Sequence, residues 1–293
     1  MKVTDLFKEG KFVVSAEVGP PKGFHIDEMI EEAKKYLTNV DAINVTDNQS
    51  SVMRLGSLAV CKVLKDNGFN PIFQMTCRDR NRIALESDLL SAAMFGIDNV
   101  LSLTGDYTKL GDHPGAKPVF DLDSVSLLYT MGLLEQGKDL GGQDLEGEPP
   151  VFAKGAVVSP CSDSVDAQLV KMERKIKAGA QFFQTQAIFD SERYIKFYER
   201  AKEFGVPIQL GIIVPKNAGM CNFMNNNVAG ISIPAEIIDE LKADKERAKA
   251  GITGTEIAAR IIRDCKDYCQ GVHIMTLGWE DKIPGLLEQA GLA

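Results

Sequence analysis

The sequence has no long apolar run and few histidines. No segment approaches about 18 consecutive apolar side chains, so we expect no membrane-spanning helix. The first residues, MKVTDLFKEGKFVVSAEV, lack the apolar stretch and small-residue cleavage site of a signal peptide, which makes the cytoplasm the expected location. Only three histidines occur, His25, His113 and His273, and no HExxH or paired CxxC motif is present. A hydrolytic zinc centre is therefore not expected, and we predict no metal ligands.

Several active-site motifs are also missing. There is no GxSxG elbow, no Walker A sequence and no GxGxxG. These absences argue against a serine hydrolase of that type, an NTPase and a Rossmann dinucleotide site. The six cysteines are scattered, so reduced thiols are expected rather than a disulfide framework. Only Cys265 and Cys269 lie close together, and two thiolates do not complete a tetrahedral metal site, so packing on one helix face is favoured.

Basic residues are fewer than acidic ones. Thirty-three Lys and Arg against 41 Asp and Glu leave a formal net charge of −8. Binding to nucleic acid or to anionic membranes generally needs clustered positive charge, so neither partner is expected. The 44% hydrophobic and 25% charged residues are typical of a folded globular chain.

Short apolar runs rich in β-branched residues alternate with helical patterns along the chain. They predict eight strands, at residues 12–18, 42–46, 71–77, 99–103, 152–159, 181–186, 207–214 and 272–277. They predict helices over 25–37, 51–68, 80–95, 122–136, 164–178, 190–204, 234–248 and 254–268, and a short one within 280–292. Residues 135–150 read as an exposed excursion and 216–233 as loop. This order predicts a single (β/α)8 TIM barrel domain over residues 1–293, with a doubly wound sheet as the structural alternative.

Active residues of such barrels lie at the carboxyl ends of the strands. The polar residues predicted there include Glu17, Thr46, Gln74, Thr76, Thr104, Gly105, Asp106, Ser159, Gln184 and Gln186. This mouth has few carboxylates, many neutral amides and hydroxyls, and little positive charge. Such a set suits a flat, hydrogen-bonding heteroaromatic ligand such as a pterin or a flavin ring.

Two acids at these strand ends are candidates for chemistry. Glu17 lies inside an apolar strand, where a charge is costly unless it is compensated. Burial raises the pKa of carboxyl groups in general, which turns a buried Glu into a usable general acid near neutral pH. An ion pair with a barrel Lys or Arg explains a strand-end Glu equally well. Asp106 follows Gly105, which permits close approach of a ligand, although an ordinary turn Asp is the simpler explanation.

At these residues the chain resembles the methylenetetrahydrofolate reductase family, a family of flavin-dependent barrels. The resemblance covers nearly the whole length. It is carried by SAEVGPPKG, NVTDNQSS, QMTCRDRN, GIDNVLSLTGD, KPVFDLDSVSLL, KMERKIKAGAQFFQTQAIFD, and the segment from GIIVPKN to SIP. The order of these pieces, and their placement on successive strand ends, make the combination specific.

The resemblance implies a reaction in one-carbon metabolism and methionine biosynthesis. Reduced flavin delivers hydride to 5,10-methylenetetrahydrofolate, giving 5-methyltetrahydrofolate, and an acid protonates the departing ring nitrogen. Glu17 matches the family's position for that acid. Asp106 matches an Asp that contacts the pterin near the flavin's pyrimidine end. Gln186 matches a substrate-binding Gln, and Thr46 matches a Thr near the flavin's reactive centre.

The resemblance also implies where the flavin's ribityl and phosphate groups lie. Candidates by position are Gln74, Thr104, Gly105, Asp106, Phe120, Asp121, Arg174 and Lys175. Arg174 and Lys175 are chemically suitable phosphate partners, although the charged run KMERKIK also fits a solvated helix face. The sequence does not separate FAD from FMN.

Two departures from the family pattern affect these expectations. Gln74 stands where the family often has a His, so that flavin contact is altered. TLGW (276–279) stands where many members have an Arg that holds substrate, and Trp279 is a candidate to stack on a substrate ring, with plain packing as the equal alternative.

The electron donor and the partners follow from the resemblance alone. The donor is NADH or NADPH, or a partner subunit with iron–sulfur or zinc centres, as in short members from anaerobes, and an oligomer is expected. Two other functions stay open at this point. One is a non-redox methyltransferase barrel that binds a pterin, and the other is an electron-relaying flavoprotein subunit without folate activity.

Overall fold

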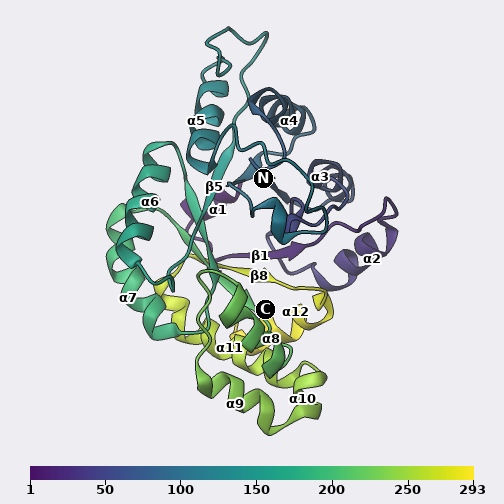
Figure 1. Ribbon diagram of the computed structural model, residues 1–293, viewed down its shortest axis with the longest axis vertical. Helices are drawn as coiled ribbons and strands as arrows, with labels where there is room; N and C mark the ends of the chain where they lie inside the picture. The colour runs from purple at the N-terminus through teal and green to yellow at the C-terminus, as the bar shows by residue number, and fades with distance from the viewer.

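The computed structural model describes residues 1–293 and contains a closed barrel of eight parallel strands (Figure 1). The strands are β1 (Val13–Val18), β2 (Ala42–Val45), β3 (Pro71–Thr76), β4 (Asn99–Leu103), β5 (Ala153–Val158), β6 (Phe182–Ala187), β7 (Ile208–Ile213) and β8 (Gly271–Met275). Each strand pairs with the next, and β8 pairs with β1, which places Ser15 opposite His273. The predicted (β/α)8 barrel is confirmed, and the doubly wound alternative is wrong because that sheet would keep open edges.

Helices surround the barrel, and no helix is both long and apolar enough to cross a membrane (Figure 1). The α-helices are α1 (Val3–Lys8), α2 (Asp27–Tyr36), α3 (Ser57–Asp66), α4 (Arg82–Met94), α5 (Ser124–Leu134), α6 (Val165–Lys177), α7 (Ser191–Ala201), α8 (Ala218–Asn227), α9 (Ala235–Ala243), α10 (Lys245–Lys249), α11 (Ile252–Cys265) and α12 (Ile283–Ala290). Short 3₁₀ turns are η1 (Gln49–Ser51), η2 (Thr108–Leu110), η3 (Lys202–Phe204), η4 (Lys266–Tyr268) and η5 (Glu280–Lys282). The segment after α5 extends beyond the barrel at the upper end of Figure 1, as expected of an exposed excursion.

Helix prediction was wrong in two places where local signals compete with packing. Residues 216–233 contain α8, although they were expected to be loop. The Asn217 side chain caps this helix by accepting from the Met220 N–H at 2.9 Å. Asn and Gly residues lower its helix propensity, so burial of Cys221 and Met224 is what stabilises it. The short α1 was not predicted at all.

Two predicted helices differ from the structure by more than a few residues at an end. The helix expected over 51–68 begins at Ser57, because Ser51 has a positive φ of 59° and Val52 and Gly56 have extended dihedrals. The helix expected over 234–248 is two helices, because Asp244 has extended dihedrals and caps α10.

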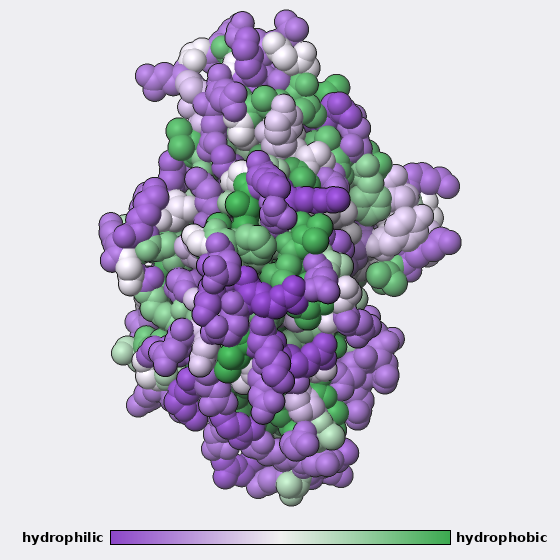
Figure 2. Space-filling model, turned by 90° about the vertical axis from the view of Figure 1, so that its left-hand side faces the viewer, coloured by the Kyte–Doolittle hydropathy of each residue, from purple (hydrophilic) through white to green (hydrophobic).

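The interior of the barrel changes character from one end to the other. Its N-terminal end is apolar: Val3 of α1 packs with inward-facing strand residues (Ala42, Ile72, Leu101, Ala153 and Phe182). Above this cluster lies a hydrogen-bonded polar layer (Ser15, Asn44, Gln184 and Gln209), each of its members at most 1% exposed. The outer surface is mixed, and Figure 2 shows one face on which hydrophilic side chains predominate around separated hydrophobic patches. Polarity inside the barrel therefore rises toward its C-terminal mouth.

A candidate active site at the barrel mouth

A polar cavity of about 380 Å³ opens at the carboxyl ends of the strands. Of the residues predicted to form the site, those that line it are Glu17, Gln74, Thr104, Gly105, Asp106, Lys175 and Gln186. They come from β1, β3, the loop after β4, α6 and β6, so the strand-end rule brings together residues up to 169 positions apart in sequence. Additional lining residues include Asp47, Arg78, Ser159, Thr185, His273 and Met275.

Glu17 is a buried carboxylate on the cavity wall, with only 7% of its surface exposed. Its partners are neutral donors and a histidine. Gln74 donates from Nε2 to one carboxylate oxygen at 3.0 Å, and Gln49 donates to the other at 3.3 Å. His273 Nε2 lies 3.5 Å from Oε2. No Lys or Arg lies within ion-pair distance, so the ion pair considered from the sequence is not formed.

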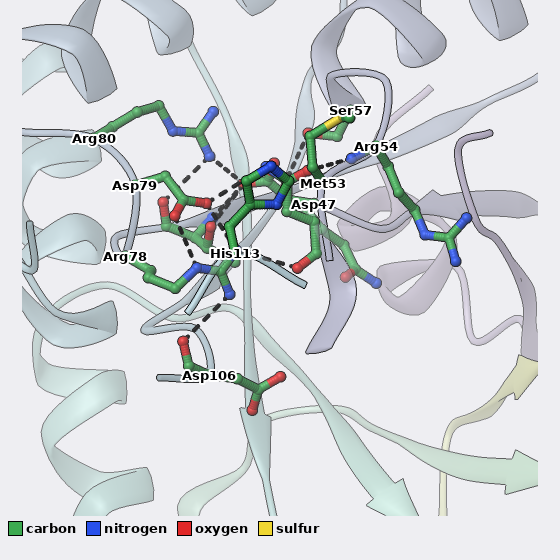
Figure 3. Close-up of polar contacts among 12 residues, drawn as sticks. Asp47, Met53, Arg54, Ser57, Arg78, Asp79, Arg80, Asp106 and His113 are labelled. Atoms are coloured by element: carbon green, nitrogen blue, oxygen red, sulfur yellow. Dashed lines mark hydrogen bonds and ion pairs between the residues drawn. The ribbon is translucent and has the colours of Figure 1, made fainter. Parts of the chain in front are cut away.

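Arg78 connects the loops on one side of the mouth by hydrogen bonds. It was not identified as a site residue from the sequence. Its guanidinium is buried and donates to Asp79 at 2.7 and 2.8 Å, to the Asn48 carbonyl at 3.1 Å and to the Asp106 carbonyl at 3.3 Å (Figure 3). Burial opposes ionisation of Asp79, but the hydrogen bonds and charge of Arg78 outweigh it and hold the pKa of Asp79 below its ordinary value. One side chain thus connects the ends of β2, β3 and β4.

A second ion pair lies beside the first. Arg80 contacts Asp47 and, at 2.9 Å, Asp88. The same Asp47 carboxylate accepts from the backbone N–H and hydroxyl of Thr76 at 2.8 and 2.9 Å. The only sequence signal for this cluster was the alternating run TCRDRN directly after β3. These contacts fix the loop after β3 against the end of β2 before any ligand binds.

Asp106 presents a free carboxylate to the cavity. Its backbone carbonyl is held by Arg78, while the carboxylate points away from that side chain and makes no hydrogen bond or ion pair within the chain (Figure 3). Gly105 has φ of +95°, and a Cβ there would lie 3.1 Å from side-chain carbons of Thr76 and Arg78. Only glycine fits this position comfortably, because of both its φ angle and its close neighbours.

Two hydroxyls on this side differ in how well they are satisfied. Thr46 is 2% exposed and does not line the cavity, and its Oγ1 has no hydrogen-bond partner. A buried polar atom normally has a partner, so this hydroxyl is an exception within the chain. The Thr104 hydroxyl is already engaged with Ser124, accepting from its backbone N–H at 3.1 Å and lying 3.2 Å from its hydroxyl.

The two cations predicted for phosphate binding lie on different faces of α6. Lys175 lines the cavity, and its Nζ donates to the Val157 carbonyl at 2.7 Å. Desolvation, with a contribution from the nearby charge of Lys171, lowers the pKa of Lys175 to about 8. Arg174 is exposed and does not line the cavity.

Phe120 and Asp121 lie on the loop after β4, at the edge of a shallower cleft that also includes Thr104. The Phe120 ring is nearly parallel to that of Tyr107, with centroids 6.4 Å apart and an interplanar angle of 10°. The Asp121 carboxylate is occupied by a bidentate pair with Arg82 at 2.8 and 2.9 Å. Those hydrogen bonds lower the pKa of Asp121 to about 2.

The two residues predicted to bind substrate besides Asp106 occupy different places. Gln186 lines the cavity, and its side-chain carbonyl accepts from the Ala187 N–H at 2.9 Å. Trp279 does not line it. The Nζ of Lys216 lies 4.7 Å from the Trp279 ring centroid and donates to the Leu277 carbonyl at 2.7 Å, so one face of the indole is covered.

Cys265 and Cys269 lie away from this cavity. Both are buried, and burial raises the pKa of each thiol to about 12. Both belong to the main hydrophobic core, as a packing role requires. They do not share one helix face as predicted, because α11 ends at Cys265 and Cys269 has extended dihedrals after η4.

Comparison with known proteins identifies the family of this chain. A sequence model described as methylenetetrahydrofolate reductase matches residues 2–291. The chain belongs to the methylenetetrahydrofolate reductase family. Members of this family are generally flavin-dependent and reduce methylenetetrahydrofolate, so the chain is an oxidoreductase that acts on CH–NH groups. The predicted family and reaction are confirmed.

Relatives of the methylenetetrahydrofolate reductase family match most of the chain at low identity. The 5,10-methylenetetrahydrofolate reductase of Pectobacterium carotovorum is 26% identical over 87% of this chain and 82% of its own. That of Escherichia coli K12 is 25% identical with the same coverage. Methylenetetrahydrofolate reductase 2 of Schizosaccharomyces pombe is 24% identical over the whole chain, which spans 48% of the fungal protein.

A solved structure has the same fold. It is an uncharacterized protein from Clostridium thermocellum that binds two copies of 5-methyl-5,6,7,8-tetrahydrofolic acid. Its TM-score is 0.65 at 15% identity, and the match covers 99% of this chain and 98% of that one. At this identity the likeness establishes the barrel architecture alone.

Proposed function

We propose that the cavity at the barrel mouth binds a flavin and 5,10-methylenetetrahydrofolate together, and that Glu17 is the acid that opens the substrate ring. The observation that carries this proposal is the position of Glu17. It is a buried carboxyl group with no Lys or Arg within ion-pair distance, held by amide donors on the wall of a cavity whose other charged lining residues, Asp47, Arg78, Asp106 and Lys175, make no hydrogen bond or ion pair with it. A group placed in this way can give a proton to a departing nitrogen at the cavity surface.

The residues present fit a flavin. A volume of about 380 Å³ accepts a flat three-ring system, and the side-chain amide of Gln74 on its wall supplies hydrogen-bonding groups. Gly105 lies on the same wall, and Lys175 supplies a cation for a phosphate. When bound and reduced, the flavin supplies the hydride for the reaction. Gln74, Thr104, Gly105 and Lys175 would hold it.

The chain's own residues have distinct roles in this proposal. Glu17 protonates the departing nitrogen and becomes a carboxylate that the N–H groups of Gln49 and Gln74 stabilise. Asp106 places a negative charge at the other side of the cavity and contacts the pterin, while Gln186 orients it by hydrogen bonds. Binding of 5-methyl-5,6,7,8-tetrahydrofolic acid by the Clostridium thermocellum barrel is compatible with a folate ligand here.

Five predicted residues have a smaller part or none. Phe120 forms a loop surface with Tyr107 beside the cleft that continues from Thr104, and we propose that it contacts the distal part of the flavin. Asp121 holds that loop through Arg82. Thr46, Arg174 and Trp279 lie outside the cavity wall, so we assign them no direct contact.

A direct test uses the purified wild-type protein under anaerobic conditions. It should be yellow as isolated, or after reconstitution with FAD or FMN, and chromatography of the released cofactor identifies which flavin it holds. After reduction by dithionite, adding 5,10-methylenetetrahydrofolate should restore the oxidised flavin spectrum. A protein that binds neither flavin contradicts the proposal. A reduced flavin that methylenetetrahydrofolate does not reoxidise would assign the chain to electron relay without folate activity.

The electron donor is a separate question with its own measurement. Among relatives, a rice protein is named for NADH and one from Caenorhabditis elegans for NADPH. We propose that either NADH or NADPH reduces the flavin directly, or a partner subunit with iron–sulfur or zinc centres does so. Mixing the oxidised protein with each nucleotide distinguishes direct reduction. If neither reacts, anaerobic co-purification from the native host with flavin and metal analysis identifies the partner.

A further inference from the structure

His273 is a buried histidine that the proposed chemistry does not yet use. It is the third residue of β8, is 4% exposed, and points into the barrel just below the mouth. Its Nε2 lies 3.5 Å from Glu17 Oε2, and its Nδ1 lies 3.2 Å from Ser15 Oγ. His25 and His113 are both exposed, so His273 is the one imidazole inside the barrel.

The polar layer below it determines which nitrogen carries the proton. The amide nitrogen of Gln209 lies 3.2 Å from Ser15 Oγ, and an amide N–H only donates, so this oxygen accepts from Gln209. The amide nitrogen of Gln184 lies 3.4 Å from the same oxygen but closer to Asn44 Oδ1, at 3.1 Å, and to Gln209 Oε1, at 3.0 Å. The single Ser15 hydroxyl proton has two possible acceptors, His273 Nδ1 at 3.2 Å and the Val272 carbonyl at 3.5 Å. The carbonyl already lies 3.3 Å from the Gln209 amide. The shorter and less occupied acceptor is Nδ1.

An accepting Nδ1 fixes the tautomer of the neutral ring. The proton then sits on Nε2, which is the nitrogen that faces Glu17. The side chain of His273 therefore connects the interior layer to the carboxyl group at the cavity wall. It approaches Glu17 from below, while Gln49 and Gln74 approach it from the loop after β2 and from β3.

Other charged groups face this pair from the elements around it. Across the cavity they are Asp47, Arg78, Asp106 and Lys175, and in the adjoining cleft on the α2 side they are Glu28, Glu32, Arg54 and Glu280, with His25. Glu280 reaches the backbone of Glu17 through the Thr276 hydroxyl, which lies 2.8 Å from the Glu280 carboxylate and 3.0 Å from the Glu17 carbonyl. None of them makes a hydrogen bond or ion pair with the Glu17 carboxylate, so His273 is its one titratable contact.

We propose that His273 is a positioning residue for Glu17. Its Nε2–H orients the carboxyl group toward the cavity and stabilises the carboxylate that remains once the proton has been given to the departing nitrogen. The imidazole keeps its own proton throughout, and solvent returns a proton to Glu17 between turnovers. This inference rests on the proposed acid role of Glu17.

The tautomer can be measured without flavin or substrate. Protein labelled with ¹⁵N-histidine gives three imidazole spin systems, and the variants His25→Gln and His113→Gln assign two of them by loss. At pH 8 the remaining ring should show a protonated Nε2 and a hydrogen-bonded, unprotonated Nδ1, and its Nε2 shift should move in Glu17→Gln. A ring that carries its proton on Nδ1 would overturn the proposal.

The kinetic test compares two replacements of His273. Glutamine places an N–H donor close to the position of Nε2, whereas leucine removes it. In His273→Leu, reoxidation of the reduced flavin by methylenetetrahydrofolate should slow about tenfold. The alkaline decline of that rate should also move up by about one pH unit, since the lost donor had favoured the charged carboxylate. His273→Gln should restore most of the rate and the profile.

Controls separate this role from a purely structural one. Flavin binding and reduction by dithionite should be unchanged in both variants, and His113→Leu should leave the pH profile as it is. Equal effects of Gln and Leu, with no movement of the profile, would contradict the proposal. If His273→Leu does not fold, the tautomer measurement and His273→Gln decide. Retention of folate reduction in Glu17→Gln would instead refute the acid role, while leaving the tautomer result intact.

Discussion

The two ends of the barrel are built from the same strands but differ in what fills them. At the N-terminal end, α1 closes the barrel, and apolar side chains such as Ile72 and Phe182 are fully buried. At the C-terminal mouth, the next inward positions of the same two strands carry Gln74 and Gln184, which line an open cavity together with Thr104 and Gln186. Side chains on one strand face the same way every second residue. Inward positions near the start of a strand therefore pack the core, and inward positions near its end line the cavity.

The largest effect is expected at the closed end. Phe182 is fully buried against the α1 end of the barrel, and its ring centroid lies 6.1 Å from that of Phe7. Phe182→Ala should lower the free energy of unfolding by about 3–5 kcal/mol, because it leaves a cavity that the barrel cannot close. Denaturant titration measures the loss. Ile83→Ala, at a position 74% exposed on α4, is the matched control and should change stability by less than about 0.5 kcal/mol.

Phe182→Ala also tests whether packing at the N-terminal end affects function at the C-terminal mouth. In the fraction of Phe182→Ala protein that is folded, flavin affinity and the rate of folate-dependent reoxidation should equal those of the wild type. A large change in either quantity would show that the apolar end shapes the mouth.

A smaller effect is expected from Arg78, which lies at the mouth but is buried like a core residue. Arg78→Met leaves Asp79 without its partner and releases the Asn48 and Asp106 carbonyls. Because water still reaches Asp79, the cost should be about 2–3 kcal/mol, below that of a fully buried pair. Flavin affinity should fall together with stability, as measured by titration and by denaturant unfolding.

Arg82 provides the control for Arg78. It also makes a bidentate pair with an aspartate, Asp121, but on the surface. Arg82→Met should leave the unfolding midpoint close to that of the wild type. Equal losses in the two variants would mean that burial of Arg78 is not what matters.

The smallest effect should appear as a pH dependence of flavin binding. The pKa of Lys175 is lowered to about 8 by desolvation, and its charged form is the one that attracts a phosphate. As pH rises through 8 that charge is lost, so flavin affinity should fall about tenfold between pH 7 and pH 9. Lys175→Met should bind flavin more weakly at pH 7 and show little change with pH. Arg174→Met should behave like the wild type, and a similar loss in both variants would contradict the assignment.

The difference between Arg174 and Lys175 shows what could have been predicted from the sequence. Both residues were equal candidates in a charged run. Leu169 and Met172 lie on the buried face of α6. Lys175 is three residues after Met172 and lies on the same face, whereas Arg174 is two residues after Met172 and points in a different direction. Helix phase was available from the sequence and would have separated them.

Strand positions were the most predictable feature, because most of the strands are short apolar runs bounded by polar residues. The same alternation placed Glu17, Gln74, Asp106 and Gln186 at one end of the barrel. Contacts across the barrel could not be predicted. His273 meets Glu17 and Ser15 only because β8 pairs with β1, more than 250 residues away in sequence, and no local pattern encodes that register.

The cluster of charged residues after β3 was missed for a related physical reason. In the run after β3, charged residues such as Arg78 and Asp79 look like a solvated loop, since sequence alone does not tell which of them turns inward. Burial of Arg78 depends on carbonyl groups supplied by the ends of β2 and β4, which come together only in the closed barrel.

The central claim is that Glu17 supplies the proton that opens the substrate ring, and Glu17→Gln tests it most directly. The variant should bind flavin with wild-type affinity and be reduced by dithionite at the wild-type rate. After reduction, its reoxidation by 5,10-methylenetetrahydrofolate in a stopped-flow spectrometer should be slower by about 10²–10⁴-fold. Reoxidation at the wild-type rate, with flavin binding intact, would contradict the account.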